Sequence, residues 1–326
     1  MKLFIQISLL LILRSFVFGQ SIQVVQEGNS SDSSFYALTR INSNEFWAGG
    51  EYGILKRLDS VGNVTDIGFL KENVNILKIV TTKKYAFVAT DNGIIYRYDF
   101  EKKQFLRKEF SEFRNKCFYD LIILKNEQIV VCGGAKGISK GEKIIPNGFV
   151  AVIDTDLVTA KIVWRCYRKF VWSLLELENN TFLSITFNGL NTKIIKTNNL
   201  KNWRKWAIVK GLVHKINLLD NKIWYCGSKN IQYNKCGISG EVAKGEKQKQ
   251  FTNTGCLWSM NTMAGDIVFV TQSGELLKTN NVTKETERIK LPGNLTLYCI
   301  EKISESKFLV VGQGKSIFIV DFKATL

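Results

Sequence analysis

The sequence predicts an all-β fold, a single seven-bladed β-propeller. A four-residue motif recurs seven times at a spacing of about 40 residues, which is the period of propeller blades. Each copy is followed by short runs rich in β-branched and aromatic residues. Long helical periodicity is absent, and no linker divides the chain into domains. One sheet unit of this size cannot bury both of its apolar faces alone, so the seven units are expected to close into a ring.

The motif consists of an apolar residue, a ring or bulky residue, a small or polar residue and an aliphatic residue. Its seven copies are 35–38 (FYAL), 76–79 (ILKI), 118–121 (FYDL), 171–174 (VWSL), 213–216 (VHKI), 257–260 (LWSM) and 297–300 (LYCI). We expect each copy to be the inner strand of one blade.

A second apolar run follows each motif and often ends in glycine, as in 46–49 (FWAG) and 223–227 (IWYCG). A third run then follows, as in 93–98 (GIIYRY). A nearly identical segment in two blades supports the period, because the sequence at 196–200 (KTNNL) recurs 82 residues later at 278–282 (KTNNV). This offset equals two blades.

The last blade lacks an outer strand, because only five residues follow its third run. The segment 21–25 (SIQVV) has strand composition. We expect this segment to pair with the last blade, which would close the ring and remove an open strand edge.

Residues 1–19 read as a signal peptide, which leaves residues 20–326 as the propeller. Lys2 precedes an apolar run of about eleven residues, Arg14 follows this run, and Val17 and Gly19 suit the cleavage site. No later segment approaches the roughly 18 apolar residues of a membrane span. We therefore expect a secreted protein without a transmembrane segment, in the extracellular space or a periplasm.

Seven scattered cysteines and five glycosylation sequons fit such a compartment. Cys226 and Cys236 are the candidate disulfide by proximity in the sequence, whereas a packed thiol is the alternative for each cysteine. No CxxC pair occurs, so we expect no metal site. The sequons at Asn29, Asn63, Asn179, Asn281 and Asn294 would make the chain a glycoprotein in a eukaryotic source.

The chain is basic, with 45 Lys and Arg against 29 Asp and Glu and a formal charge of +16. Such a charge favours an acidic protein or an anionic glycan as partner, although a merely solvated basic surface is the alternative. Two basic loops, 137–147 and 244–249, are candidates for contact with a partner. No nucleic-acid module is recognisable, and we expect a monomer.

The amino-acid sequence of the repeats resembles the BNR or Asp-box repeat class, in particular the propellers related to the photosystem II assembly and stability factor. Residues 196–203 (KTNNLKNW) align with the turn of that repeat, and 49–55 (GGEYGIL) match the part before it. The Asp-box aspartate is replaced by Asn198 and Asn280, and the central glycines are missing. The resemblance implies the fold and no functional residues.

The third motif position is the candidate ligand site. It is small or polar in every blade and holds Lys78, Asp120 and Lys215, which are expected to form a charged ring at the mouth of the axial channel. The alternative is that crowding near the axis selects small or solvated side chains. The only histidine, His214, stands at the ring position of the motif and is expected to be a packed ring.

No catalytic motif is recognisable, and no cofactor is expected. The sequence therefore favours a secreted, non-catalytic binding or assembly protein that uses a basic loop face to hold an acidic partner. The alternative is a glycan-active hydrolase or lyase, which would require two or three carboxylates at one end of the channel.

Overall fold

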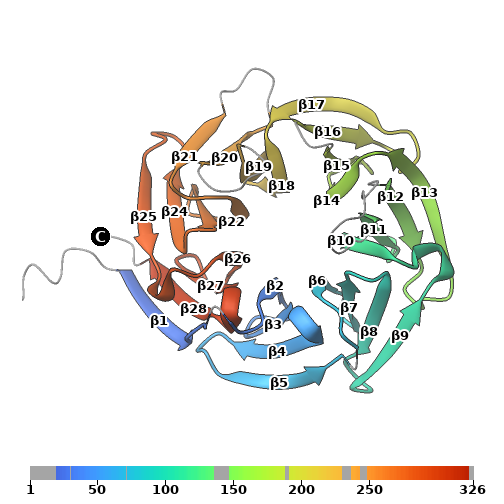
Figure 1. Cartoon of the computed structure of the whole chain (residues 1–326), viewed down its shortest axis with the longest axis horizontal. Helices are drawn as coiled ribbons and strands as arrows, with labels where there is room; N and C mark the ends of the chain where they lie inside the picture. The colour runs from blue at the N-terminus through green and yellow to red at the C-terminus, as the bar shows by residue number, and fades with distance from the viewer. Residues whose placement is uncertain are drawn as a thin grey trace, which may run out of the picture.

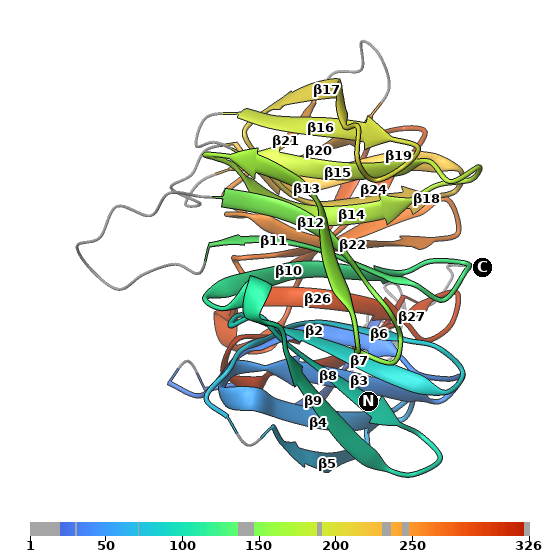
Figure 2. The same cartoon turned by 90° about the vertical axis from the view of Figure 1, so that its right-hand side faces the viewer.

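The computed structural model describes residues 20–29, 31–70, 72–135, 147–187, 191–229, 236–242 and 248–322. These residues form seven antiparallel sheets of four strands each, arranged as a ring around a central axis (Figure 1). The strands run along the axis, so the loops gather on two opposite faces (Figure 2). The predicted seven-bladed β-propeller is confirmed.

In each blade the strands follow one another from the axis outwards. The inner strands are β2 (Phe35–Arg40), β6 (Ile76–Thr81), β10 (Lys116–Ile123), β14 (Phe170–Glu176), β18 (Leu212–Leu219), β22 (Leu257–Met263) and β26 (Leu297–Lys302). The second strands are β3 (Glu45–Gly50), β7 (Tyr85–Thr90), β11 (Ile129–Ala135), β15 (Phe182–Phe187), β19 (Lys222–Ser228), β23 (Asp266–Thr271) and β27 (Lys307–Gly312). The third strands are β4 (Ile54–Asp59), β8 (Ile94–Asp99), β12 (Asn147–Ile153), β16 (Asn191–Thr197), β20 (Cys236–Glu241), β24 (Glu275–Asn280) and β28 (Ile317–Phe322). The outer strands are β5 (Val64–Phe69), β9 (Gln104–Glu109), β13 (Ala160–Tyr167), β17 (Arg204–Lys210), β21 (Lys249–Thr252), β25 (Thr286–Lys290) and β1 (Gln20–Gln26).

Blade one begins at β2 and blade seven at β26. Single 3-10 turns lie in four of the loops: η1 (Glu51–Gly53), η2 (Ser111–Phe113), η3 (Pro292–Asn294) and η4 (Gln313–Lys315). None of these short helices has the length and apolar character that a membrane crossing requires. We call the face where the inner strands begin the upper face, and the opposite one the lower face.

The N-terminal strand β1 closes the ring as the outer strand of blade seven. It pairs antiparallel with β28, with Gln20 opposite Phe322 and Val24 opposite Phe318 (Figure 1). The predicted segment 21–25 lies within this strand. Because β28 would otherwise present an open edge, this pairing joins the first and last described strands into one sheet.

The core lies between neighbouring blades. Phe87 of blade two, for example, packs in one buried cluster with Phe118 and Phe149 of blade three, and similar clusters occur around the ring. Each blade therefore buries its apolar faces against its two neighbours, as expected for a unit that is not stable by itself.

Every inner strand contains a β-bulge near its second motif position. In blade one, for example, Phe35 is opposite Gly50 whereas Ala37 is already opposite Gly49, so Tyr36 is the extra residue. Corresponding shifts occur in the other six blades. Neighbouring residues of a regular strand face opposite sides, but a bulge re-aims side chains. The second and third motif residues of each blade consequently both line the axial cavity.

The bulge also explains the glycines at the ends of second strands. A Cβ on Gly133 would lie 1.9 Å from the carbonyl oxygen of Cys117, and a Cβ on Gly227 would lie 2.0 Å from that of Leu212. Blades one and seven have Gly50 and Gly312 in the same setting. Because the bulge brings the inner-strand backbone so close, glycine is required in these four blades.

Candidate functional site

The candidate site is a cavity of about 690 Å³ on the axis of the ring. Its wall is made chiefly of the second and third motif residues of all seven inner strands. Since these residues stand near the start of each inner strand, the cavity lies towards the upper face and continues downwards along blades seven, one and two, past Thr39, Thr81 and Glu301.

An arc of rings surrounds the upper part of the cavity. Six of the seven second motif positions carry a ring, and Leu77 stands at the seventh. The neighbouring centroid separations are 5.0 Å for Tyr36–Tyr298, 5.5 Å for Tyr298–Trp258, 4.3 Å for Trp258–His214, 6.0 Å for His214–Trp172 and 4.3 Å for Trp172–Tyr119. These separations are typical of packed aromatic pairs, so the arc is a continuous apolar wall.

His214 belongs to this wall. Its ring lies between Trp172 and Trp258, and burial lowers the pKa of the imidazole to about 3. The side chain is therefore a neutral packed ring at physiological pH, in agreement with the sequence interpretation.

Below the rings, Asp120 joins three blades. Its carboxylate lies 3.0 Å from Lys78 Nζ and accepts hydrogen bonds from Ser173 Oγ at 3.1 Å and from the Leu174 N–H at 2.9 Å. Burial alone would raise the pKa of Asp120, but the charges of Lys78 and Lys215 outweigh burial and lower the pKa. Asp120 is thus an ionised anchor whose acceptor capacity is largely used within the protein.

Lys215 is the second cation of the cavity and has no such partner. None of the acids in the described residues forms an ion pair with it. The charge of Lys78 and burial together lower the pKa of Lys215, and Asp120 offsets this only in part. Lys78 differs: burial lowers its pKa, but Asp120 outweighs this effect and raises the pKa. The site therefore contains one lysine, Lys78, that is ion-paired and one, Lys215, that forms no ion pair with the acids of the described residues.

The structure brings the three predicted residues, Lys78, Asp120 and Lys215, together on one cavity wall. Sequence reasoning missed Glu301, which lines the lower part of the cavity and whose pKa is raised by burial. Glu301 stands two residues after Cys299, a third motif residue. Since alternate residues of a strand face the same side, continuing the motif by two positions would have found it.

The upper face is built differently in its two halves. In blades one, two, six and seven, the residue after the second strand accepts a hydrogen bond from the N–H just before the inner strand. These pairs are Ser34–Glu51, Asn75–Asp91, Cys256–Gln272 and Thr296–Gln313. The corresponding loops of blades three and five are longer, spanning 136–146 and 229–235 between their strands. The predicted basic loop 137–147 lies almost wholly outside the described residues, as does most of 244–249.

Charge also differs around the upper face. The described upper loops and strand starts of blades three to five present Arg114, Lys116, Arg168, Lys169 and Lys229, with Glu112 as an acid among them. Those of blades one and two present Glu51, Glu72 and Asp91. Among the described residues, the upper side of blades three to five therefore carries mainly cations, whereas that of blades one and two carries acids.

The disulfide between Cys226 and Cys236 that the sequence indicated is not formed. All seven cysteines are free, and Cys226 is opposite Ser239, three residues along β20 from Cys236. A disulfide requires Cα atoms within about 7 Å, which this register does not provide. The predicted signal peptide, 1–19, lies outside the described residues.

No protein-family model and no curated protein matches this chain. Several solved structures, however, match it in fold. A catalytically inactive histidine-to-alanine form of virginiamycin B lyase from Staphylococcus aureus with quinupristin superposes with a TM-score of 0.72 at 11% identity, over 93% of this chain and 100% of that chain. YCF48 bound to D1 peptide gives 0.68 at 8% identity, over 93% and 96%. The WD40 propeller domain of Doa1 gives 0.66 at 10% identity, over 94% and 98%.

The fold is the one that these proteins share. The comparison thereby supports the resemblance of the repeat sequence to a class of propellers, and YCF48 belongs to that class. At such low identity the similarity extends to the fold alone.

Proposed function

We propose that this propeller is a secreted, non-catalytic binding protein that holds an acidic protein segment at the upper mouth of its axial cavity. The observation that carries the proposal is that Lys215 has no ion-pair partner on the described cavity wall. Of the two carboxylates there, Asp120 is engaged by Lys78 and by two hydrogen bonds, and Glu301 lies lower in the cavity.

An anion beside Lys215 would relieve the repulsion that lowers the pKa of this lysine. Inside a partly closed apolar cavity, a charge-assisted hydrogen bond is stronger than in water. The arc of rings offers apolar surface to the rest of the bound segment. The basic half of the upper face would attract an acidic partner and orient it over the cavity.

The similarity to YCF48 supports this kind of use, because that propeller is described as bound to a peptide. A hydrolase or lyase is the weaker alternative. Glu301 is the one cavity carboxylate in the described residues besides the engaged Asp120, and the imidazole of His214 is packed between two indoles.

A peptide titration tests the proposal. Trp172 and Trp258 line the cavity, so their fluorescence would report a bound peptide. An acidic peptide library should contain ligands whose affinity falls roughly tenfold or more in Lys215→Ala, since a hydrogen bond to a charged group is worth about 1.5–3 kcal/mol. Lys83→Ala, at an exposed lysine on the lower face, is the matched control. Ligands that bind both variants equally well would contradict the proposal.

The secreted state has its own test. Expression in the native host should yield a mature chain that starts near Gln20 in the medium or periplasm, as measured by intact mass. A cell-retained chain that keeps residues 1–19 would contradict it.

A further inference from the structure

Two blades share a Lys-Thr-Asn-Asn turn but differ in the charges around it. In blade four the turn begins at Lys196 and joins β16 to β17, and in blade six it begins at Lys278 and joins β24 to β25. Both turns lie on the lower face, away from the aromatic mouth of the axial cavity. They therefore provide an internal comparison of the same local structure in two electrostatic settings.

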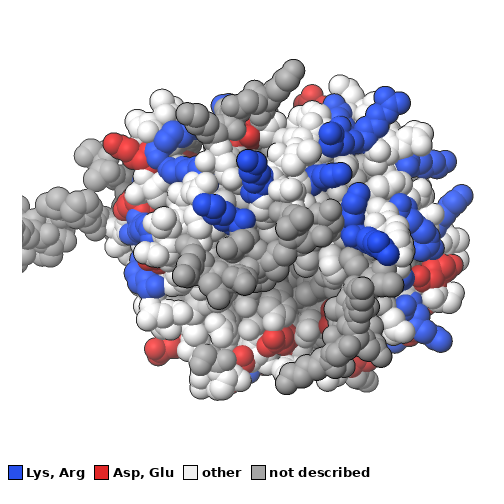
Figure 3. All heavy atoms as spheres, turned by 45° about the horizontal axis from the view of Figure 1, so that its top comes forward, with Lys and Arg blue, Asp and Glu red and all other residues white. Residues whose placement is uncertain are grey.

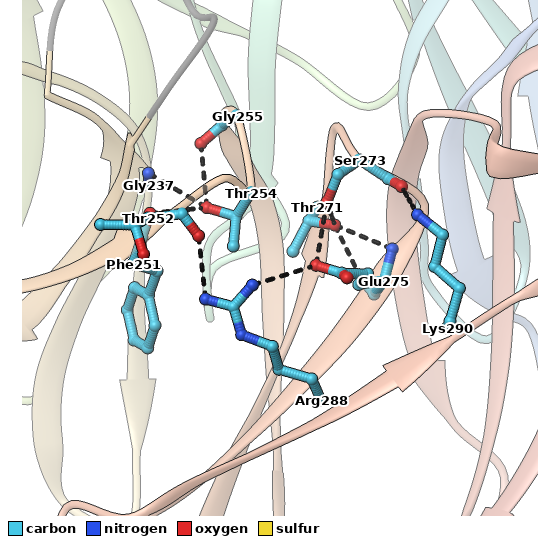
Figure 4. Close-up of polar contacts among 10 residues, drawn as sticks. All are labelled: Gly237, Phe251, Thr252, Thr254, Gly255, Thr271, Ser273, Glu275, Arg288 and Lys290. Atoms are coloured by element: carbon cyan, nitrogen blue, oxygen red, sulfur yellow. Dashed lines mark hydrogen bonds and ion pairs between the residues drawn. The ribbon is translucent and has the colours of Figure 1, made fainter.

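In blade six the lysine is neutralised. Lys278 Nζ lies 3.6 Å from Asp266 and 3.7 Å from Glu287, and Glu287 is directly opposite Lys278 on the outer strand. The arginine of the same outer strand is also engaged. Arg288 lies 3.6 Å from Glu275 and donates to the Thr252 carbonyl at 2.9 Å (Figure 4).

In blade four both acids are replaced. The residue directly opposite Lys196 is Arg204, so a second cation stands where Glu287 stands in blade six. The counterpart of Asp266 is Thr181, because Phe182 is opposite Thr197 as Ile267 is opposite Thr279. Neither Lys196 nor Arg204 forms an ion pair with any acid in the described residues. Like charges directly opposite on a sheet are destabilising, so this arrangement costs stability unless an anion binds there.

The two cations line a pocket of about 440 Å³ together with Lys205, Trp206 and the polar residues of the turn. The turn itself is fixed, because Asn199 Oδ1 accepts hydrogen bonds from the backbone N–H groups of Lys201 at 3.0 Å and Asn202 at 2.9 Å. Trp206 is the extra residue of a bulge in β17 and is 41% exposed. The pocket thus offers three cations and an exposed indole on a rigid frame.

Further cations extend beyond the pocket. Blade four, residues 168–211, contains eight basic residues against Glu176 and Glu178. The basic residues are Arg168, Lys169, Lys193, Lys196, Lys201, Arg204, Lys205 and Lys210. Figure 3 shows Lys and Arg side chains gathered at the upper right, where β16 and β17 lie. Seven residues of β17 span roughly 20 Å, so the basic strip suits a linear ligand with repeated negative charges better than a single small anion.

We propose that the blade-four pocket binds sulfate groups of a sulfated polysaccharide. The guanidinium of Arg204 can bind one sulfate with two parallel hydrogen bonds, while Lys196 and Lys205 contribute point charges around it. The exposed face of Trp206 packs against a sugar ring, and the neighbouring lysines of β16 and β17 bind further sulfates along the chain. This site is separate from the axial cavity and does not depend on the peptide-binding proposal.

The test is calorimetric titration of the mature protein with a heparin-derived hexasaccharide at about 0.15 M salt. The decisive variant is Arg204→Glu, which copies the charge pairing of blade six. We expect it to weaken binding at least tenfold while the melting temperature stays the same or rises, because the repulsion opposite Lys196 is replaced by attraction. Lys196→Ala provides a second variant should Arg204→Glu not fold.

Lys278→Ala is the matched control, since it removes the lysine of the same turn in blade six. It should bind the hexasaccharide as the wild type does. Unchanged binding in Arg204→Glu and Lys196→Ala, or equal weakening in Lys278→Ala, would overturn the proposal.

Two further probes separate the ligand classes. A desulfated hexasaccharide that keeps its carboxylates should not bind measurably. Vesicles containing phosphatidylserine should bind wild type and Arg204→Glu alike or not at all. If vesicles bind in an Arg204-dependent manner and the hexasaccharide does not, the ligand is a lipid surface and the assignment to a sulfated polysaccharide is wrong.

Discussion

Lys78 Nζ lies 3.0 Å from Asp120 Oδ1, and this ion pair connects the inner strands of blades two and three beside the axis. Asp120 extends the connection to blade four through Ser173 and Leu174. The same carboxylate therefore has two consequences. It stabilises the ring, and because it pairs with Lys78, Lys215 is left without an ion-pair partner among the described acids.

Asp120→Asn should destabilise the fold strongly. The Asp120 side chain is only 6% exposed, and removing one partner of a buried pair leaves Lys78 uncompensated, at a cost of about 3 kcal/mol. Chemical denaturation of the variant beside Lys83→Ala measures this difference. A loss below about 0.5 kcal/mol would mean that the pair has no structural role.

The effect of Asp120 has a defined pH dependence. Its pKa is lower in the folded state than in the unfolded chain, so its contribution is complete above the unfolded pKa of about 3.9 and is lost as the pH falls through the folded value. The stability difference between wild type and Asp120→Asn should therefore be constant from pH 7 to about 5 and shrink below about pH 4.

His214 should stay neutral far below the usual range of histidine. Its pKa is lowered to about 3, so its ring protons should show no titration between pH 7.5 and 4.5 in NMR spectra, which contain a single histidine. Since the unfolded chain binds a proton near pH 6.5, stability should also decline as the pH falls below this value. A titration midpoint near 6.5 would show that the imidazole is solvated rather than packed between Trp172 and Trp258.

Deleting residues 20–26 should lower the melting temperature sharply. The deletion removes β1, the outer strand of blade seven, and leaves the edge of β28 unpaired. Ile22→Thr is the control, because it changes one exposed side chain of β1 and keeps the backbone hydrogen bonds. Unchanged melting of the deletion variant would show that the ring does not need this closure.

Gly133→Ala should be far more costly than Gly134→Ala. A Cβ at Gly133 meets the Cys117 carbonyl oxygen at 1.9 Å, whereas one at Gly134 meets a ring carbon of Phe170 at 3.0 Å. A side chain can shift where a backbone cannot, so we expect about 3 kcal/mol for Gly133→Ala and a smaller effect for its neighbour. Equal effects in thermal unfolding would contradict the role given to the inner-strand bulge.

The sequence predicted the ring because its signal is repeated. The pattern at Phe35–Leu38 returns in every blade, and the pairing of 21–25 with the last blade follows from counting strands. Lys78, Asp120 and Lys215 could be placed near the axis on the same grounds, since equivalent positions of a ring converge there.

The partners of these residues could not be predicted in this way. The hydrogen bond from Ser173 to Asp120 depends on how two blades pack. The bulge that turns Tyr36 towards the axis is marked only by the glycine of the neighbouring strand, Gly50, and such a glycine is equally typical of a tight turn. The disulfide between Cys226 and Cys236 was wrong because closeness in the chain does not fix the register of β19 and β20.

The most direct test of the binding account is a crystal structure with a bound acidic peptide selected against the wild-type protein. The account predicts a carboxylate of the peptide within hydrogen-bonding distance of Lys215 Nζ, with the rest of the peptide against the arc from Tyr36 to Tyr119. A peptide bound elsewhere, with the axial cavity free of it, would contradict the account.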